Sequence, residues 1–316
     1  MTDFTFAIVN WNTRDLLARC LRSIERESAG FTVQVLVADN GSSDGSADMV
    51  ARDFPGVTLV RHARNLGFAG GHEALFGKSD GRYHVLVNSD IELLPGCLTA
   101  LDRRMREDEG IGVLGPQLLE PGGAIQPGCR RFPTLTSQWF ESLGLGRLFP
   151  HSPRFNGYRM GDFDHRSARD VDQVMGSFFL IRRELLAEIG ILDTRFFMYY
   201  EEVDYCLRVR RAGYRVFFEP DARVRHLGGG TSSMVRVATI RRKMRSMHDY
   251  FQKHRGPGVY LPLVAICATD GASHCAAALL TGRQPLQTMR AYWLGLWDVV
   301  TRRPSLYGEA GAEADA

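Results

Sequence analysis

Residues 85–95, VLVNSDIELLP, decide the fold class of this chain. Residues 84–87 are mainly apolar and do not alternate with polar ones, which predicts a strand buried on both faces, as in a parallel sheet. Asn88-Ser89-Asp90 follow this strand, and a helix is expected to start at Pro95. Open α/β sheets bind ligands at the carboxyl ends of their strands, although an ordinary solvated turn contains the same polar residue types.

The composition indicates a globular protein without a strong charge bias. The net charge of +3 over 316 residues gives no sign of nucleic-acid binding. Six cysteines form no CxxC pair, so we expect reduced core residues of a cytosolic protein. The N-terminus has no signal-peptide pattern. Asp270, Ser273 and His274 interrupt the longest apolar stretch, 259–280, so no membrane span is expected.

Four alternations of strand and helix are expected in the first ninety residues or so. The predicted strands are 4–10, 33–38, 57–61 and 84–87. A polar loop at 39–45 and a glycine-rich loop at 64–71 follow strands at the edge expected to hold Asp90. The glycine-rich loop matches neither GxGxxG nor a Walker loop, so its position carries the argument. The pattern is typical of a nucleotide-binding α/β half with a parallel sheet.

Regular periodicity is lost between residues 116 and 172 and returns afterwards. We assign this irregular stretch partly to acceptor binding, because long loops in compact domains are usually functional. A strand at 174–182 and a helix at 183–189 follow, and two more strands are expected at 214–219 and 222–226. His226 ends the last of these strands and precedes a glycine loop.

A run of aromatic residues leads into a helix whose first turn holds Glu201, Glu202 and Asp204. The helix dipole favours acids at this end, which is the simplest account of all three. Three carboxylates this close repel one another unless the site needs them. Glu201 and Asp204 share one helix face, and Glu202 points elsewhere, so at least one carboxylate is free to face a cleft.

The C-terminal part is expected to be helical. Residues 235–255 form a basic helix with an apolar stripe of Ile240, Met244, Met247 and Phe251. This helix either packs on the protein with a solvated basic face or meets anionic lipid headgroups or a lipid-diphosphate acceptor. Further apolar helices follow, and both peripheral membrane contact and a homodimer stay open. The tail 308–316 is expected to be disordered.

Seven motifs in order resemble the inverting glycosyltransferases of family 2, which have a GT-A fold. The similarity is greatest to bacterial rhamnosyltransferase-like members that build cell-surface polysaccharide. The motifs are IVNWN (8–12), VADNGSSDGS (37–46), RNLGFAGG (64–71), LVNSDIEL (86–93), VMGSFFLIRR (174–183), FFMYYEEVDYCLR (196–208) and VRHLGGGTS (224–232). The resemblance implies an α/β catalytic domain over 1–232, with a nucleotide-sugar half to about 115 and an acceptor half after it. A C-terminal helical region would cover 233–307.

The resemblance implies roles for the residues that bind the donor. Asp39 would accept the N3–H of a uracil or thymine ring, and Trp11 would stack on that base. Arg64, Asn65 and Gly67 would lie near the diphosphate of the dTDP- or UDP-sugar.

The resemblance also implies a metal site and a catalytic base. Asn88, Ser89 and Asp90 occupy the place of the family's DXD-like motif, with Asn88 and Ser89 on the nucleotide-sugar side. Asp90 would bind Mn²⁺ or Mg²⁺ together with His226. Glu202 would be the base, with Asp204 as the second candidate. The sequence departs from the family pattern at Asn88, at Glu202, where an aspartate is usual, and at His72-Glu73.

The expected function is inverting, metal-dependent transfer of a sugar, L-rhamnose in the first place, to a glycan or lipid-linked acceptor. The expected location is the cytoplasm, including the inner face of the cell membrane. The alternative is a catalytically degenerate protein that binds a nucleotide sugar or a glycan as a scaffold. A sugar-nucleotide pyrophosphorylase ranks lower, because residues 10–13, NWNT, lack the basic glycine-rich loop such an enzyme needs after its first strand.

Overall fold

The computed structural model describes residues 2–228, 236–282 and 284–301. The chain divides into two compact units. The first comprises Met1–Arg130, Asp164–Thr194 and Glu201–Thr231, and the second comprises Arg131–Phe163, Arg195–Tyr200 and Ser232–Ala316. The predicted disordered tail and most of the predicted glycine loop after His226 lie outside the described residues. The division into a catalytic domain and a helical region near residue 232 stays a prediction.

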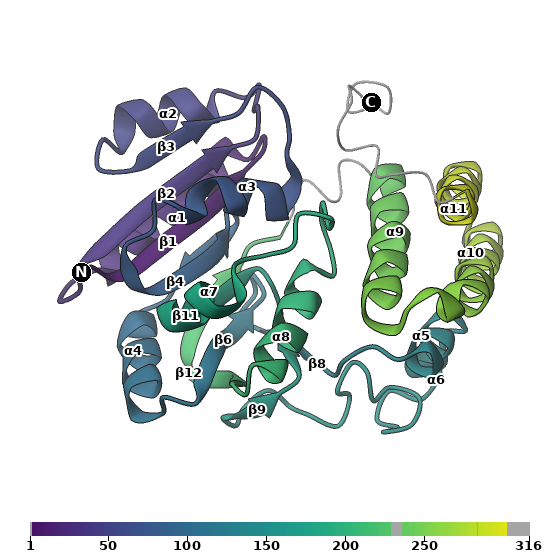
Figure 1. The fold of residues 1–316 in the computed structure, drawn as a ribbon. Helices are drawn as coiled ribbons and strands as arrows, with labels where there is room; N and C mark the ends of the chain where they lie inside the picture. Colours follow the sequence, from purple (N-terminus) through teal and green to yellow (C-terminus); the bar gives the residue numbers. More distant parts are fainter. Residues whose placement is uncertain (1, 229–235, 283, 302–316) are drawn as a thin grey trace. The chain divides into compact units, whose positions relative to one another are not determined.

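The first unit contains the central sheet, whose N-terminal elements are purple and blue in Figure 1. Its strands are β1 (Thr2–Asn10), β2 (Val33–Asp39), β3 (Thr58–Arg61), β4 (Gly81–Asn88), β5 (Ile91–Leu93), β6 (Ile111–Leu119), β7 (Ile125–Gln126), β8 (Cys129–Arg130), β9 (Arg169–Val171), β10 (Gln173–Val174), β11 (Phe178–Arg182) and β12 (Arg215–His226). Its helices are α1 (Arg14–Glu27), α2 (Ser46–Asp53), α3 (Gly67–Phe76), α4 (Cys97–Glu107), α7 (Arg183–Ile189) and α8 (Glu201–Arg211).

The main sheet has the strand order β3-β2-β1-β4-β11-β6-β12-β5. The pairs β3–β2, β2–β1, β1–β4 and β6–β12 are parallel. The inserted strand β11 is antiparallel to both β4 and β6, and β5 is antiparallel to β12. The prediction of a mostly parallel central sheet is therefore confirmed.

The core explains why the strand at residues 84–87 has no polar alternation. His84, Val85, Leu86 and Val87 lie in β4 and are all buried. Apolar side chains of α1 and α4 join those of β1 and β4 in one cluster. Because helices cover such a strand on both faces, each of its positions must be compatible with burial.

Three predicted elements differ from the structure. The strand expected at 174–182 is divided into β10 and β11, because β10 pairs with β8 in a separate small sheet while β11 enters the main sheet. The two strands expected at 214–219 and 222–226 are one strand, β12, with a register shift after Glu219. The helix expected at Pro95 starts at Cys97, because β5 extends the chain first and Gly96 caps the helix with a φ of 82°.

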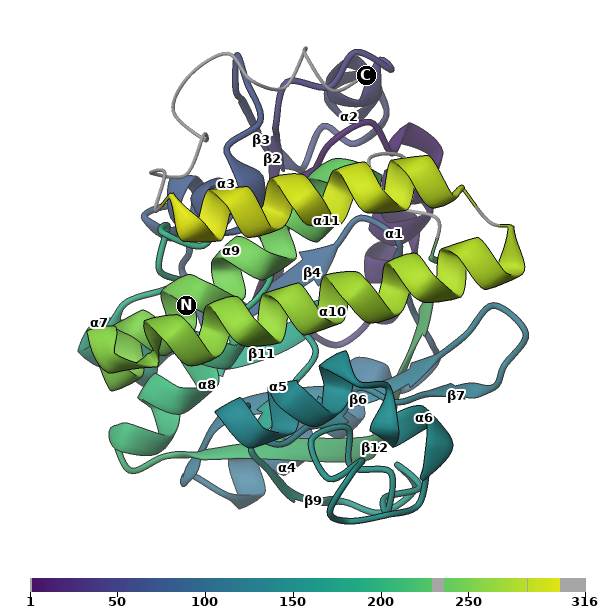
Figure 2. The ribbon, with the colours of Figure 1, turned by 90° about the vertical axis from the view of Figure 1, so that its right-hand side faces the viewer.

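The second unit is helical. It contains α5 (Leu135–Ser142), α6 (Leu145–Leu148), α9 (Arg236–Arg255), a 3₁₀ turn at Pro257–Val259, α10 (Tyr260–Thr281) and α11 (Pro285–Val300). Helices α10 and α11 run side by side (Figure 2), and α11 also packs on α9. An ion pair joins Arg241 Nε to Asp298 Oδ2 at 2.7 Å. Met244, Met247 and Phe251 of the predicted apolar stripe are buried, as a packed helix requires.

Helix α10 covers the apolar stretch at 259–280, which the sequence predicts to be helical. The segment Pro257–Thr281 is long and apolar enough to cross a membrane by length and composition, despite its interrupting polar residues. A core helix of a soluble protein meets the same two criteria, so this feature by itself assigns no membrane span. All six cysteines are free, and five of them are buried.

A glycine at the start of β4 tests how closely β1 and β4 approach. A Cβ atom at Gly81 would lie 2.6 Å from the Thr5 backbone nitrogen, which leaves no room for a side chain. We expect Gly81→Ala to destabilise the protein by about 1–3 kcal/mol, measured as a lower urea midpoint. Gly56→Ala is the control, because a Cβ there meets nothing within 4 Å. Equal midpoints for the two variants would contradict this packing.

Candidate active site

The parallel register brings three polar strand ends together in the first unit. Strand β1 lies between β2 and β4, with Asn10 opposite Asp39 and Val9 opposite Asn88. The loops that follow these strands therefore leave the same edge of the sheet, as the sequence predicted. This edge is where open α/β sheets bind their ligands.

Asp39 is held rigidly at this edge. Its side chain is only 3% exposed, and both carboxylate oxygens accept hydrogen bonds. Oδ1 accepts from Asn10 Nδ2 at 2.9 Å, and Oδ2 accepts from the backbone N–H of Ser42 at 2.9 Å. Each oxygen keeps a second lone pair, so the carboxylate can still accept a bond from a ligand. Sequence reasoning missed Asn10, and its only signal was an amide directly at a strand end.

Trp11 lies in the turn between β1 and α1 and is half-buried. The next residue, Asn12, has a φ of 53°, a left-handed conformation that asparagine tolerates better than most residues. The Asn12 backbone N–H donates to Ser42 Oγ at 2.9 Å, and its Oδ1 accepts from Ser43 N–H at 2.8 Å. These bonds tie the Trp11 turn to the loop that follows Asp39.

The glycine-rich loop packs beside the same region. Asn65 Oδ1 accepts from the N–H of Gly67 at 2.8 Å and from Asn40 Nδ2 at 3.2 Å. Gly67 has a φ of 77°, which explains a glycine at the start of α3. A Cβ on Gly41 would lie 3.3 Å from the Cα of Arg64, so the two loops are in close contact. The Arg64 side chain is exposed.

His72, where the sequence departs from the family pattern, is a core residue. It is fully buried, and its ring lies edge-on to Phe68 with the ring centroids 4.4 Å apart. Burial, with a smaller effect of His84, lowers the pKa of His72 well below its usual value. The ring is enclosed by the core and presents no surface to a sugar or a diphosphate.

Asn88 and Ser89 connect the end of β4 to its neighbours. The Asn88 backbone N–H donates to the Ser177 carbonyl at 2.9 Å. Ser89 Oγ lies 2.7 Å from Thr13 Oγ1, which in turn donates to Asn10 Oδ1 at 2.6 Å. A continuous set of hydrogen bonds therefore runs from Ser89 through Thr13 and Asn10 to Asp39.

Asp90 and His226 face each other at the same edge. Asp90 Oδ2 lies 3.4 Å from His226 Nε2, and β5 and β12 hold the two residues through their antiparallel pairing. His226 Nδ1 lies 2.9 Å from Oε1 of Gln126. Asp90 is 6% exposed, and its Oδ1 has no hydrogen-bond partner among residues 2–228, 236–282 and 284–301.

This pair has the chemistry of a cation site. An amide oxygen at Nδ1 requires the proton on that nitrogen, so the lone pair of a neutral ring at Nε2 faces the Asp90 carboxylate. Two facing lone pairs are unfavourable unless a second proton or a metal ion lies near them. No third His, Cys, Asp or Glu completes a cluster within the described part of the chain, so further ligands would have to come from water or a bound ligand.

The acids of α8 differ in burial. Glu201 is 5% exposed and its Oε2 has no hydrogen-bond partner among the described residues. Burial, and secondarily the neighbouring Glu202, raise the pKa of Glu201 well above its usual value, so its carboxyl group holds a proton more tightly than usual. Glu202 is half-buried. Of the two adjacent carboxylates, Glu202 is therefore the more exposed, although its Oε2 atom is buried.

Glu202 lies near the end of β4 through the turn between β10 and β11. A Cβ on Gly176 would be 3.4 Å from the Cβ of Glu202 and 3.9 Å from its carboxyl carbon. The next residue, Ser177, accepts the hydrogen bond from Asn88. Glu202 is thus separated from the Asn88-Ser89-Asp90 segment by one short turn, a proximity that the sequence did not reveal.

Asp204, the second candidate base, is completely buried. Its Oδ2 accepts a hydrogen bond from Arg208 Nε at 2.9 Å. The same guanidinium donates to the carbonyls of Ile189 and Ile191 at 2.6 Å. This arrangement anchors α8 to the end of α7, which is a structural use of the carboxylate.

Comparison with solved structures defines the class of fold. A mannosyltransferase from Pyrobaculum calidifontis, solved with GDP-mannose and Mn²⁺, superposes with a TM-score of 0.58 at 17% identity. The superposition covers 96% of this chain and 90% of the other. The structure of GalNAc-T7 with UDP, GalNAc and Mn²⁺ superposes with a TM-score of 0.55 at 17% identity, over 72% of this chain and 43% of the other. The fold is therefore of the GT-A type, as predicted.

Sequence comparison identifies the family. The model of the family described as glycosyl transferase family 2 matches residues 5–190, more than half of the chain, so the chain belongs to that family. An N-acetylglucosaminyl-diphospho-decaprenol L-rhamnosyltransferase of Mycobacterium tuberculosis is 32% identical over 205 residues. The match covers 61% of this chain and 66% of that relative, just under two thirds of its length. The predicted family and the likeness to rhamnosyltransferases are confirmed.

The pKa of Glu201 makes a prediction about stability and pH. A carboxyl group with a raised pKa in the folded state stabilises the protein most below its unfolded pKa, and this contribution is lost as the pH rises through the folded value. Between about pH 5 and pH 8, the urea midpoint of the wild type should fall relative to that of Glu201→Gln. Glu188→Gln, at an exposed position on α7, should retain the wild-type pH dependence. Parallel curves for the wild type and Glu201→Gln would contradict this assignment.

Proposed function

We propose that this protein is an inverting, metal-dependent glycosyltransferase that moves L-rhamnose from dTDP-rhamnose to a hydroxyl of a lipid-linked or polysaccharide acceptor in cell-surface glycan synthesis. The observation that carries the proposal is that Asp39 and the Asp90–His226 pair lie at one edge of one sheet, with Glu202 of α8 close to the turn that binds Asn88. Family membership supports glycosyl transfer. The name of the mycobacterial relative supports rhamnose as the sugar and a lipid diphosphate as the carrier of the acceptor.

The donor nucleotide would bind at the ends of β1 and β2. Asp39 would accept the N3–H of thymine or uracil with a lone pair that Asn10 and Ser42 leave unused. The base would stack on Trp11, whose turn is fixed by Asn12. Because Asp39 is held on both oxygens before the ligand arrives, little ordering is lost on binding.

The diphosphate would lie between the glycine-rich loop and the end of β4. Arg64, Asn65 and Gly67 would approach it from one side, and Asn88 and Ser89 from the other. Asp90 and His226 would hold Mn²⁺ or Mg²⁺, and both solved structures named above contain Mn²⁺. A bound divalent ion would offset the charge that develops on the departing diphosphate.

Glu202 would act as the general base. Its carboxylate would take the proton of the acceptor hydroxyl while the hydroxyl oxygen forms a bond to the anomeric carbon. The bond between that carbon and the diphosphate oxygen breaks on the opposite face, so the configuration inverts. Asp204 stays the second candidate, although its ion pair with Arg208 leaves Glu202 better placed.

We place the reaction in the cytoplasm, at the inner face of the membrane when the acceptor is lipid-linked. Six free cysteines are consistent with a reducing compartment. Contact of the C-terminal helices with the membrane and a homodimer stay predictions.

A transfer assay tests this proposal against the scaffold alternative, which Asn88 and Glu202 motivate by their departure from the family pattern. The protein would be incubated with Mn²⁺, a lipid-linked N-acetylglucosamine acceptor, and either dTDP-rhamnose or UDP-glucose. Transfer of the sugar with inversion, fastest with dTDP-rhamnose, is the expected result. Donor binding without transfer or hydrolysis would favour the scaffold.

Replacing the base separates chemistry from binding. Glu202→Gln keeps the size of the side chain and removes its ability to take a proton. We expect kcat to fall by about 10²–10⁴-fold, while the Kd for the donor changes little. Glu188→Gln is the matched control and should keep the wild-type kcat. An unchanged kcat in Glu202→Gln would show that Glu202 is not the general base and would assign that role to Asp204 or another group.

Gln126 tests how the metal site is supported. Its contact with Nδ1 sets the tautomer and orientation of His226, so Gln126→Leu should weaken Mn²⁺ binding by about 10–100-fold. The measurement is the electron paramagnetic resonance signal of free Mn²⁺ during titration in the presence of dTDP. Asp90→Asn should weaken binding at least as much, and Gln252→Leu, on α9, should not. If both Gln126→Leu and Asp90→Asn bound Mn²⁺ with the wild-type affinity, the metal ion would not bind at Asp90 and His226.

A further inference from the structure

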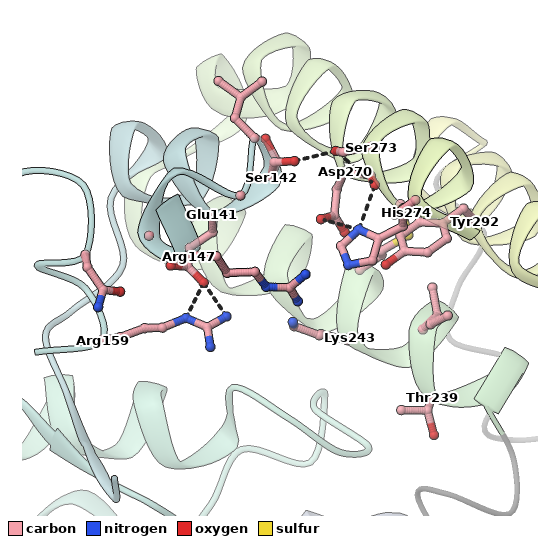
Figure 3. A pocket seen from close by; sticks show the side chains of 17 residues that line it. Glu141, Ser142, Arg147, Arg159, Thr239, Lys243, Asp270, Ser273, His274 and Tyr292 are labelled. Atoms are coloured by element: carbon pink, nitrogen blue, oxygen red, sulfur yellow. Dashed lines mark hydrogen bonds and ion pairs between the residues drawn. The ribbon is translucent and has the colours of Figure 1, made fainter. Parts of the chain in front are cut away.

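The second unit contains a cavity that the proposed transfer reaction does not use. Its volume is about 550 Å³, and α5, α6, α9 and α10 all contribute to its lining. Figure 3 shows Arg147, Lys243 and the Glu141–Arg159 pair around this space, with His274 projecting from α10. A volume of this size is typical of sites for small molecules.

The charges that line the cavity favour an anion. Three basic side chains, Arg147, Arg159 and Lys243, line the cavity together with two acids, Glu141 and Asp270. Glu141 Oε2 lies 2.6 Å from the Arg159 guanidinium. The charged ends of Arg147 and Lys243 point toward the same space in Figure 3. Arginine and lysine together are the usual partners of phosphate groups.

His274 also lines this cavity and is held by Asp270. Its Nδ1 lies 2.9 Å from the Asp270 carbonyl and 3.3 Å from Oδ1 of the same residue. The hydrogen bond to Asp270 raises the pKa of His274, which favours the charged ring. The imidazole ring of His274 also stacks on the ring of Tyr292, with the ring centroids 5.1 Å apart.

Asn156 supplies an acceptor in the same cavity. It is buried, and its Nδ2 donates to the Pro150 carbonyl at 2.6 Å. Its Oδ1 has no hydrogen-bond partner within the part of the chain that the structure describes. A buried acceptor without a partner is costly, and a hydroxyl or amide N–H of a bound molecule would satisfy it.

An apolar groove lies between α10 and α11, the two helices that run side by side in Figure 2. Its volume is about 480 Å³, and its lining includes Cys267, Ala272, Cys275 and Trp293. Tyr292 lines both this groove and the cationic cavity. Large apolar side chains of the same two helices are exposed, including Leu280 at 89% and Trp293 at 65%. Large exposed apolar side chains next to an apolar groove are typical of an interaction site.

We propose that the second unit binds a lipid diphosphate, with the phosphate groups in the cationic cavity and the hydrocarbon chain against the groove of α10 and α11. An amphiphile of this class matches both halves of the surface, whereas a free phosphate matches only the first and a neutral lipid only the second. The inference rests on the proposed function, because a lipid diphosphate would be the carrier of the acceptor sugar. It assigns substrate recognition to helices outside the donor-binding sheet.

The test is calorimetric titration of the full chain with farnesyl diphosphate, inorganic diphosphate and farnesol, in EDTA and without donor. Farnesyl diphosphate should bind at least about tenfold more tightly than either fragment, because it alone engages both surfaces. If inorganic diphosphate bound as tightly as farnesyl diphosphate, the cavity would be a site for free phosphate groups. If farnesol bound as tightly, the phosphate groups would contribute nothing to binding. Either result would overturn the proposal.

Two variants locate the binding. Arg147→Glu reverses a charge at an exposed position of the cavity, and Ala272→Phe fills the groove from an exposed position of α10. Each should weaken farnesyl diphosphate by about tenfold or more, whereas Arg255→Glu, at the exposed end of α9, should change affinity less than about twofold. Circular dichroism of each variant verifies its fold. Wild-type affinity in both test variants would overturn the proposal.

A last variant separates this site from the donor site. Asp90→Asn should bind farnesyl diphosphate as the wild type does, because the proposed lipid site does not include Asp90. Loss of binding in Asp90→Asn would assign the lipid diphosphate to the donor site and overturn the inference. If the wild-type protein binds farnesyl diphosphate but transfers no sugar, the lipid site stands and the result counts against the proposed function alone.

Discussion

The parallel pairing of β1 with β2 on one side and β4 on the other is the constraint on which the site depends. It aligns Asn10 with Asp39 and places Asn88 one register position away, so that the loops after three strands leave one edge. Hydrogen bonds through Thr13 and Asn10 then join the segment containing Asp90 to Asp39. A shift in register would separate these groups by the rise of a strand residue, about 3.3 Å, which exceeds the tolerance of a hydrogen bond.

The second determinant is unequal burial among neighbouring carboxylates. Asp204 is buried with Arg208 as its partner, Glu201 is buried with a raised pKa, and Glu202 is half-buried beside Gly176. Three acids in four residues repel one another in water, yet here each has a different environment. That difference leaves Glu202 the most exposed of the three acids, while Asp204 and its partner Arg208 anchor α8 to the end of α7.

Much of the fold follows from local patterns. The apolar run of β4, the loops after β2 and β3, and the alternation of strands and helices all predict a mostly parallel α/β sheet, and the structure has one. The errors occur where long-range pairing decides. Residues 174–182 divide between two sheets because β10 pairs with β8 while β11 pairs with β4 and β6, and nothing in the local sequence shows these partners.

The site was predictable only in part, for the same reason. Residues such as Asp39 and Asp90 stand at strand ends, where a pattern identifies them. Gln126 contacts His226 from 100 positions away in the chain, and Gly176 reaches Glu202 through the turn between β10 and β11. Contacts of this kind depend on the folded arrangement. The cationic cavity likewise combines residues from α5–α6, α9 and α10 that no single motif unites.

The central claim is that the edge bearing Asp39, Asp90 and His226 binds a pyrimidine nucleoside diphosphate together with a divalent ion. Thermal unfolding of the full chain with dTDP, UDP or GDP, each with Mn²⁺ or EDTA, tests it most directly. A ligand present at 100 times its Kd adds about 2.7 kcal/mol to the free energy of unfolding. Stabilisation by dTDP or UDP only when Mn²⁺ is present is the predicted result. No response to either pyrimidine nucleotide, with or without the metal, would contradict the account.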